Sequence, residues 1–461
     1  MHTGGTREEL LSLFRDTILP LADAYQATRR HLRWDPGSDT LFVGHRSYPL
    51  SSLGRIFLVG AGKAGVPMAK AVVDVLSQDE RLWSRFAGGS VNVYREQARE
   101  SIPGVTFYPA DHPTPNEYSV AGARAAVELL STTRSGDLVL AIISGGGSSL
   151  LTLPQEGMTL DDLRSANRVL VTGGPSIQEI NTVRKHLCRV KGGGLRMAAP
   201  SALFATLILS DVIGDDLSSI ASGPTVQDSS TCADAVSVLE SYSLLERIPV
   251  AARACLLRPE PEEEIWGTRW IELADRTQTV IVASNAVVLE ELARTLSTDK
   301  DHKPGLHVIL EPVPVTGTVS QVSVEHGMHC EELLQKSGGP LFVLFGGEPV
   351  VAVPEGAAGT GGRMLHYALL TAQRIAGTGW TVLAAGTDGI DGTAPAAGAV
   401  LDGDTARLAA EMGLNATRYL EQFDSYGFFR ALEECSGERF LNAPGPTGTN
   451  VNDIMLWFHG T

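Results

Sequence analysis

Several apolar runs typical of buried strands recur along this chain, and they end in glycine-rich loops before helical patterns begin. One run leads into Gly60-Ala61-Gly62-Lys63-Ala64-Gly65, and the run ending at Ile143 leads into Ser144-Gly145-Gly146-Gly147-Ser148-Ser149. Later runs end near Gly346-Gly347-Glu348 and Gly386-Thr387-Asp388. This alternation favours a parallel sheet with helices on both faces, and such sheets bind ligands at the carboxyl ends of their strands. The sequence therefore predicts an α/β fold with polar sites in these loops.

The length of the chain and one break in its pattern predict two domains. A chain of 461 residues is longer than one hydrophobic core usually serves. Residues 258–264 are proline-rich and acidic, which is typical of a surface loop near a domain boundary. The strand pattern restarts at Thr279–Ala283, and residues 7–33 have the apolar spacing of an amphipathic helix or helix pair. We expect two three-layer α/β/α domains with largely parallel sheets, a Rossmann-like one at 1–268 and a second one at 269–461.

Composition narrows the class of protein. The formal net charge is -16, and an acidic surface disfavours nucleic acid and anionic membranes as partners. No apolar run has the length of a membrane span. The 5 cysteines are scattered and show no CxxC spacing, which favours free thiols in a reducing compartment. Together with the lack of a signal-peptide core near the first residues, this predicts a cytoplasmic protein.

The first glycine loop, Gly60–Gly65, follows a strand and opens a helix, as a dinucleotide-binding loop would. Its backbone amides and the helix N-terminus would face an anion, and Lys63 would place a point charge on a phosphate or carboxylate. No acidic residue about 20 positions later completes the dinucleotide pattern. The alternative is tight strand-to-helix packing with a solvated Lys63.

The second glycine loop, Ser144–Ser149, contains three successive glycines, which cost backbone entropy that a plain turn seldom needs. They let a phosphate approach the main chain, and the serines add donors. The alternative is a flexible connector. The spacing around Ser148 does not match G-x-S-x-G, so this loop is not a nucleophile elbow.

The only dense basic cluster of the sequence consists of Arg184-Lys185-His186 and Arg189-Val190-Lys191. In an acidic chain such a cluster is a candidate for holding an anionic ligand, and the alternative is a solvated helix face. Lys191 is the member that precedes three glycines, and we include it among the candidate binding residues.

Carboxylates follow two of the predicted strands. Asp211 comes after the strand that ends at Leu209, while Asp388 and Asp391 lie in the loop after residue 385. Carboxylates at a strand end hold Mg²⁺ together with phosphate oxygens and waters. The alternatives are helix capping near Asp211 and Asp-Gly turns at the other two positions.

Taken together, these segments resemble one family, the type-2 glycerate kinases, whose C-terminal unit is the MOFRL domain. The matching motifs follow one order along nearly the whole chain: GAGKAG at 60–65, HPTPNE at 112–117, ISGGGSSLL at 143–151, NTVRKHLCRVKGGGL at 181–195, SDVIGDDLSSIASGPT at 210–225, FGGEPVV at 345–351, GTGGR at 359–363, AAGTDGIDG at 384–392 and PTGTNVND at 446–453. One departure is visible, because Met364-Leu365-His366-Tyr367 follow Arg363 where the family often has Asn and a Gln-Glu-like stretch.

The resemblance implies two α/β domains with the active site in the cleft between them. It also implies ATP and Mg²⁺ as cofactors and phosphoryl transfer to D-glycerate, usually at the 2-hydroxyl. Lys63 and Arg363 are the catalytic cations that it implies. Relatives of this family have also been labelled hydroxypyruvate reductases.

From these motifs we hypothesise a set of roles. Catalysis is assigned to Lys63, Arg363 and Asp388, and the metal to Asp211 or Asp388. The predicted nucleotide- and substrate-binding residues are Gly60, Gly62, Ser144, Gly145, Gly146, Gly147, Ser148, Lys191, Glu348 and Asp391. A monomer or homodimer is expected. The alternatives are an NAD(P)H-dependent hydroxypyruvate reductase and a non-catalytic sensor of sugar phosphates or nucleotides.

Overall fold

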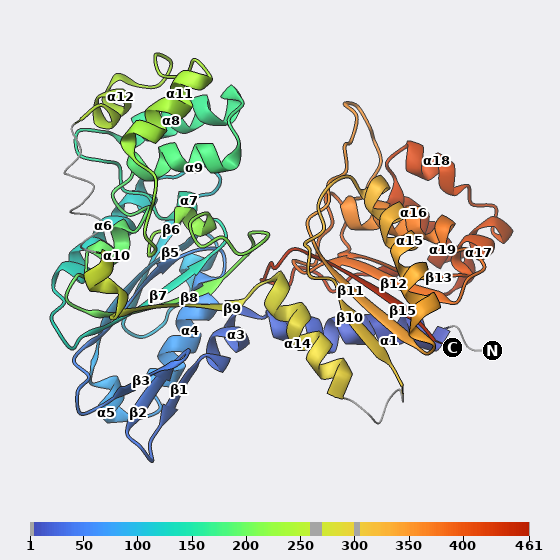
Figure 1. Ribbon diagram of the computed structural model, residues 1–461, viewed down its shortest axis with the longest axis horizontal. Helices are drawn as coiled ribbons and strands as arrows, with labels where there is room; N and C mark the ends of the chain where they lie inside the picture. Colours follow the sequence, from blue (N-terminus) through green and yellow to red (C-terminus); the bar gives the residue numbers. More distant parts are fainter. Residues whose placement is uncertain (1–3, 259–269, 299–304, 461) are drawn as a thin grey trace. The chain divides into compact units, whose positions relative to one another are not determined.

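The computed structural model describes residues 4–258, 270–298 and 305–460 and divides into two units (Figure 1). The central unit comprises Ala24–Val282. The terminal unit combines Met1–Asp23 with Ala283–Thr461. The α/β fold class and the presence of two units are confirmed.

The central unit is built on a six-stranded sheet. Its strands are β4 (Ile56–Ala61), β5 (Phe86–Tyr94), β6 (Val105–Ala110), β7 (Leu138–Ser144), β8 (Leu203–Leu209) and β9 (Thr277–Ala283). Their order is β6-β5-β4-β7-β8-β9, and β4 pairs in parallel with both β5 and β7. The chain therefore reverses its winding direction at β4, which creates the crevice where doubly wound sheets bind ligands. This confirms the Rossmann-like prediction.

The strands of this sheet form where the sequence is continuously apolar. Every residue of β4 and of β7 is buried, as expected for central parallel strands covered on both faces. Helix α6 (Glu117–Ser131) covers the face that carries Phe57 and Val59, where its Ala123 packs into the same core.

The remaining elements of the central unit are a small antiparallel sheet and further helices. The small sheet, which was not predicted, consists of β1 (Leu32–Asp35), β2 (Thr40–Val43) and β3 (Arg46–Pro49). The other helices are α3 (Ala24–Arg30), α4 (Gly65–Leu76), α5 (Glu80–Trp83), η2 (Gln97–Arg99), α7 (Gly147–Leu150), α8 (Leu160–Gly173), α9 (Ile177–His186), α10 (Gly194–Met197), η3 (Ile220–Ser222), α11 (Cys232–Ser241) and α12 (Val250–Leu256). Helices α8, α9, α11 and α12 form a lobe with a core of its own (Figure 1, top left).

The terminal unit contains a second six-stranded sheet, and the predicted direction of its strands is corrected. Its strands are β10 (His307–Leu310), β11 (Leu341–Gly347), β12 (Trp380–Gly386), β13 (Gly398–Asp402), β14 (Leu441–Asn442) and β15 (Asp453–His459), in the order β10-β11-β15-β12-β13-β14. Only β10 and β11 pair in parallel, whereas β15 lies antiparallel between β11 and β12. Parallel neighbours need a crossover connection, usually a helix, and no helix separates β12 from its neighbour β13.

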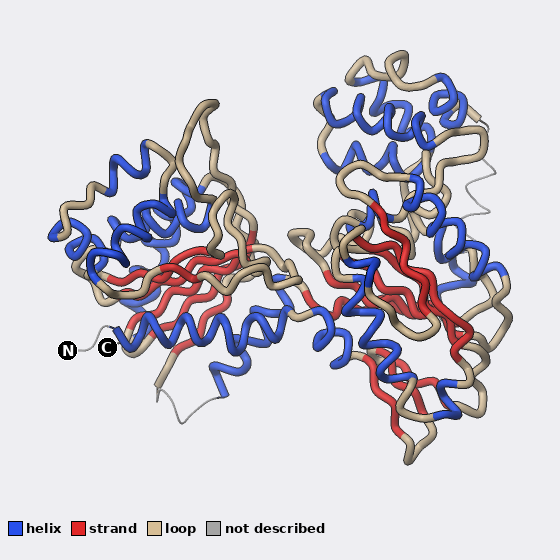
Figure 2. The backbone as a smooth tube through the Cα atoms, turned by 180° about the vertical axis from the view of Figure 1, so that it is seen from behind, coloured by secondary structure: helices blue, strands red, loops and turns tan. Residues whose placement is uncertain are grey.

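Helices cover both faces of this second sheet. Those of the terminal unit are α1 (Gly4–Leu13), η1 (Phe14–Ile18), α2 (Leu19–Ala22), α14 (Asn285–Thr298), α15 (Val319–Ser337), α16 (Arg363–Arg374), α17 (Thr405–Glu411), α18 (Ala416–Glu421) and α19 (Ser425–Ser436). Figures 1 and 2 show α1 and α14 on one face of the sheet and α15, α16 and α19 on the other. The predicted three layers are therefore present.

The division of the chain differs from the predicted ranges 1–268 and 269–461 in two ways. The first helix belongs to the terminal unit, where Arg7 pairs with Asp402 at 3.0 Å and Thr449 donates to the Ala22 carbonyl at 2.6 Å. The strand expected to open the second domain, β9, instead joins the first sheet beside β8. An amphipathic pattern shows that a helix covers a core but not which core. Residue 268 itself lies outside the described residues.

Within the described ranges, no helix combines the length and the apolar character that spanning a bilayer requires. None of the five cysteines, all of which lie within the described ranges, forms a disulfide bond.

Candidate functional site

The two predicted glycine loops of the central unit lie side by side at the reversal point of the sheet. The first loop follows β4 and the second follows β7, its paired neighbour. Two hydrogen bonds join the loops: the Lys63 amide donates to the Gly145 carbonyl at 2.9 Å, and the Ala64 amide donates to Ser144 Oγ at 3.0 Å. The structure therefore brings together residues about 80 positions apart in the sequence, as the strand-end argument predicted.

Close packing between the two loops accounts for the glycines of the first loop. Gly62 has a φ of 145°, and a Cβ there would lie 2.0 Å from Ser144 Oγ. A Cβ at Gly60 would lie 2.1 Å from the Ile142 carbonyl oxygen. Any larger residue at either position would therefore push the loops apart. The packing interpretation holds for these two glycines, and their contact with a ligand stays a prediction.

Lys63 lies over the second glycine loop. A Cβ at Gly146 would lie 3.3 Å from both Cγ and Cε of Lys63, so the stem of the lysine passes directly over that glycine. The ammonium is 6.0 Å from the centre of the Tyr94 ring. No carboxylate of the described residues forms an ion pair with it. His112, which was not predicted as a site residue, lies beside the same glycine, and burial together with the Lys63 charge lowers the pKa of its imidazole.

Asp211 borders the same loop from the next strand. It follows β8, and a Cβ at Gly145 would lie 2.0 Å from its Oδ2. No three His, Cys, Asp or Glu side chains among the described residues are grouped closely enough to hold a metal. Mg²⁺ at phosphate-transfer sites usually takes only one or two carboxylates and completes its shell with phosphate oxygens and waters. A single carboxylate beside the loop therefore fits such an ion.

Buried polar groups hold the end of the second glycine loop, near Ser148. The Ser148 hydroxyl is 2.8 Å from that of Ser222, which donates to Asn181 Oδ1 at 3.3 Å. Lys191 is 5% exposed, and its ammonium donates to the carbonyls of Ser148 and Leu151. Lys191 thus contacts the loop itself, while its predicted contact with a ligand stays a prediction. Sequence reasoning missed Ser222 and Asn181, because neither lies in a glycine loop.

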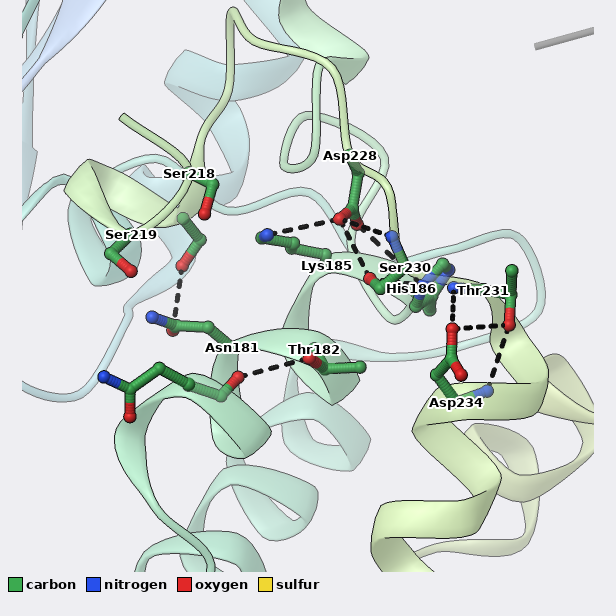
Figure 3. Close-up of polar contacts among 12 residues, drawn as sticks. Asn181, Thr182, Lys185, His186, Ser218, Ser219, Asp228, Ser230, Thr231 and Asp234 are labelled. Carbon is green, nitrogen blue, oxygen red and sulfur yellow. Dashed lines mark hydrogen bonds and ion pairs between the residues drawn. The ribbon is translucent and has the colours of Figure 1, made fainter. Parts of the chain in front are cut away.

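In the rest of the predicted basic cluster, Lys185 is paired with a carboxylate. Figure 3 shows Lys185 and Ser230 converging on Asp228, with the Lys185 ammonium 3.2 Å from Asp228 Oδ1. His186 Nε2 lies 3.2 Å from the Ser230 hydroxyl. These basic residues also end helix α9, where positive charge complements the helix dipole. The helix-face interpretation therefore accounts for Lys185 and His186.

In the terminal unit, Arg363 is held by two carboxylates. It begins helix α16, and its Nε lies 2.5 Å from Asp453 Oδ2 while its Nη2 lies 3.3 Å from Asp453 Oδ1. Its Nη1 donates to Glu348 Oε1 at 3.0 Å. Asp453 is 2% exposed, and burial raises the pKa of its carboxyl to about 7. The predicted residues Arg363 and Glu348 are therefore in direct contact.

The two aspartates of the loop after β12 lie in the same neighbourhood. Asp391 accepts hydrogen bonds from the amides of Met364 and Leu365 at 3.1 and 2.7 Å, and so caps helix α16, whose own N-cap residue has no side chain. Burial raises the pKa of Asp391 to about 6. Asp388 is half-buried, and its Oδ1 and Asp453 Oδ1 lie 3.1 and 3.3 Å from a Cβ placed at Gly386.

Asp453 is the main functional candidate that sequence reasoning missed. It is the first residue of β15, and its register partners are Gly347 on β11 and Gly386 on β12. The amino end of an antiparallel strand thus lies between the carboxyl ends of its two neighbours, where Glu348 and Asp388 follow. A largely parallel sheet would have placed Asp453 at the opposite edge. The signal in the sequence was an acidic residue directly before a continuous apolar run.

Two family models match the chain. The model described as "Domain of unknown function (DUF4147)" matches residues 9–257, and the MOFRL family model matches residues 341–453. The first match contains both glycine loops, Asp211 and Lys191. The second contains Glu348, Arg363, the two aspartates after β12 and Asp453.

Named relatives are similar over nearly the whole chain. A protein from Pyrococcus horikoshii named glycerate 2-kinase is 33% identical, with 94% of this chain and 93% of the relative covered. One from Thermotoga maritima named D-glycerate 2-kinase is 35% identical, covering 88% and 91%. The crystal structure of a glycerate kinase from the same organism has a TM-score of 0.82 at 30% identity, covering 99% of both chains. An Agrobacterium vitis protein provisionally named hydroxypyruvate reductase is 35% identical, covering 87% and 86%.

Proposed function

The chain belongs to the type-2 glycerate kinase family, in which a DUF4147 domain precedes a MOFRL domain, and we propose that it transfers a phosphoryl group from ATP to D-glycerate with Mg²⁺ and forms 2-phosphoglycerate. Phosphoryl transfer asks a protein mainly to position its substrates and to neutralise charge. The observation that carries the proposal is the second glycine loop at the reversal point of the sheet, with a lysine over it that no described carboxylate neutralises. Such a loop suits an anionic group.

In the central unit, the second glycine loop receives phosphate groups of the nucleotide. Gly147 packs against Ala221, and the stem of Lys63 passes over Gly146, so that the Lys63 ammonium can neutralise the group in transfer. Contacts with the second loop and with Gln97 fix the backbone of Lys63, since its amide donates to the Gly145 carbonyl and its carbonyl accepts from Gln97 at 2.7 Å. A lysine held in this way loses little freedom when the anion binds.

In the terminal unit, Arg363 contacts an anionic group of the substrates. It does so through the N–H groups that are not bonded to Asp453 or Glu348. A guanidinium has five N–H donors, and Asp453 and Glu348 take three of them. Asp453 fixes the plane of the guanidinium through two adjacent donors, which is the arrangement that gives an arginine a defined direction. Asp388 orients the hydroxyl that is phosphorylated.

Asp211 is the proposed ligand of Mg²⁺, and Asp388 is the second candidate. When bound, the ion would supply positive charge that neutralises the phosphates. Replacing Asp211 by Asn should raise the Mg²⁺ concentration needed for half-maximal activity, whereas the same change at Asp388 should raise it only if Asp388 holds the ion. An unchanged Mg²⁺ titration for Asp211→Asn would exclude this role.

The experiment that tests the function is a phosphorus NMR assay of purified protein with ATP, Mg²⁺ and D-glycerate. A new phosphomonoester signal is expected, and its coupling to protons distinguishes 2-phosphoglycerate from 3-phosphoglycerate. Without any phosphoryl transfer under these conditions, the proposal is wrong. A 3-phosphoglycerate signal would keep the kinase and correct the position.

A second candidate is an NAD(P)H-dependent hydroxypyruvate reductase, which the name of the Agrobacterium relative favours. Dinucleotide sites usually carry an acidic residue at the end of the second strand to bind the ribose. Here the second strand, β5, ends at Tyr94, and Arg95 follows. We therefore favour the kinase. Oxidation of NADH by the protein with hydroxypyruvate, run beside the NMR assay, would reverse this order.

A further inference from the structure

Lys191 carries a buried positive charge that no described acidic residue balances. Its side chain is 5% exposed, and its ammonium donates to the Ser148 carbonyl and, at 3.1 Å, to the Leu151 carbonyl. These bonds use two of the three ammonium donors and leave the charge unbalanced. No carboxylate among the described residues pairs with it, and the nearby Arg184 adds a like charge. Burial lowers the pKa of this lysine.

Two other buried cations of the central unit are accommodated differently. Lys185 has an ion pair with Asp228. Arg196 is fully buried but reaches the hydroxyl of Thr277 and the carbonyls of Ala199 and Ala202, and it lies over the Phe204 ring. A delocalised guanidinium tolerates such an environment better than an ammonium, which is compact and strongly hydrated. A buried ammonium without a counter-charge is costly, so its position needs an explanation.

The position of Lys191 supplies one. Both carbonyls that it contacts belong to the end of the second glycine loop and the helical turn α7 that follows. Lys63 passes over Gly146 in the same loop. Two lysines thus contact the loop, Lys63 at Gly146 and Lys191 at its end. An anion seated on the loop would lie in the field of both, and in a poorly solvated site that field is only weakly screened.

We propose that the counter-charge of Lys191 is the anionic group bound on the Ser144–Ser149 loop, and that Lys191 attracts it through its electric field without contact. This rests on the proposed function in one respect, namely that the loop receives an anion. Lys191 is then a positioning residue. It holds the end of the loop through two carbonyls and raises the affinity for negative charge, while the unliganded protein bears the cost of its burial. The anion is a phosphate of the nucleotide or the carboxylate of the hydroxy acid.

The test compares wild-type protein with Lys191→Gln, which keeps a donor for the carbonyls and removes the charge. Pyrophosphate, ADP, D-glycerate and uncharged adenosine are titrated separately by calorimetry, with adenosine also measured by competition against ADP. We expect affinity for pyrophosphate and ADP to fall on the order of tenfold or more, with adenosine affinity unchanged and the melting temperature of the unliganded protein equal or higher. A loss confined to D-glycerate would identify the carboxylate as the anion.

Two outcomes would overturn the inference. Equal losses for ADP and adenosine would show that Lys191 only supports the loop, and unchanged affinity for every anion would show that its charge is irrelevant. Lys191→Met is the second variant if the Gln protein does not fold. The matched control is Lys70→Met, which removes an exposed lysine paired with Asp74 on α4 and should leave all four affinities unchanged. ADP binding with the expected charge dependence but without phosphoryl transfer would retain this inference while the proposed function failed.

Discussion

The two charged clusters of this protein treat their cations in opposite ways. In the central unit, Lys63 and Lys191 flank a glycine loop, and no carboxylate of the described residues pairs with either. In the terminal unit, Arg363 is hydrogen-bonded to Asp453 and Glu348, and the negative charge of Asp391 also favours its protonated form. The positive charge of the first cluster is available to a ligand, whereas the positive charge of the second is largely neutralised by carboxylates of the protein. A substitution should therefore harm binding and rate in the first cluster, but rate and stability together in the second.

The largest expected effect breaks the first cluster. Replacing Lys63 by Ala removes the cation over the loop and should lower kcat on the order of a thousandfold, the scale of a lost charge-stabilising group in phosphoryl transfer. The free energy of unfolding should change by only about 0.5 kcal/mol, because the ammonium makes no ion pair with the described residues. Steady-state kinetics and denaturant unfolding measure the two quantities. Lys70→Ala serves as the control, and near-normal turnover of the Lys63 variant would remove this residue from the mechanism.

An intermediate effect should distinguish the second cluster. Replacing Arg363 by Met leaves the buried Asp453 without its partner and should cost on the order of 2 kcal/mol of unfolding free energy. The cost is limited because Asp453 can take up a proton. Adding Asp453→Asn to this variant should restore most of the loss, since a neutral amide needs no counter-charge. If the two substitutions were simply additive in urea unfolding, the pair would not be coupled and the contrast between the clusters would fail.

A further expected effect is a fall of stability with rising pH that the second cluster should cause. Burial raises the pKa of Asp453 to about 7 and that of Asp391 to about 6, above the values of an unfolded aspartate near 3.9. The folded state therefore binds more protons than the unfolded state between these limits, so stability should fall as the pH rises from about 4 to about 7. Asp453→Asn should flatten this slope in thermal unfolding. A slope identical to that of the wild type would mean that Asp453 ionises normally.

The central unit could be predicted from the sequence more completely than the terminal one. Strands β4, β7 and β8 appear as continuous apolar runs because both of their faces are covered, and each ends in a loop rich in glycine or acid. Parallel order then fixes which loops meet. Lys63, Ser144 and Asp211, each of which was predicted as a site residue, are neighbours in the structure.

The terminal unit shows what a pattern of side chains cannot encode. The apolar run of β15 predicts a strand but not its direction, so the position of Asp453 between β11 and β12 could not be inferred. The capping of α16 by Asp391 also escaped prediction, because the helix and its cap lie 27 positions apart. Ser222 is a third case. It reaches Ser148 through a backbone with a φ of 61°, a left-handed conformation that nothing in its immediate sequence requires.

The division of the chain also bears on the order in which the protein is made. The central unit is one continuous segment, Ala24–Val282, whereas the terminal unit needs residues 4–22 as well as a sheet whose central strand is β15. During synthesis the central unit is therefore complete while the first helix still lacks its sheet. The apolar face of that amphipathic helix therefore stays uncovered while more than half of the chain emerges from the ribosome. Chaperone binding to nascent chains should accordingly concentrate on the first helix and end only when β15 has left the ribosome.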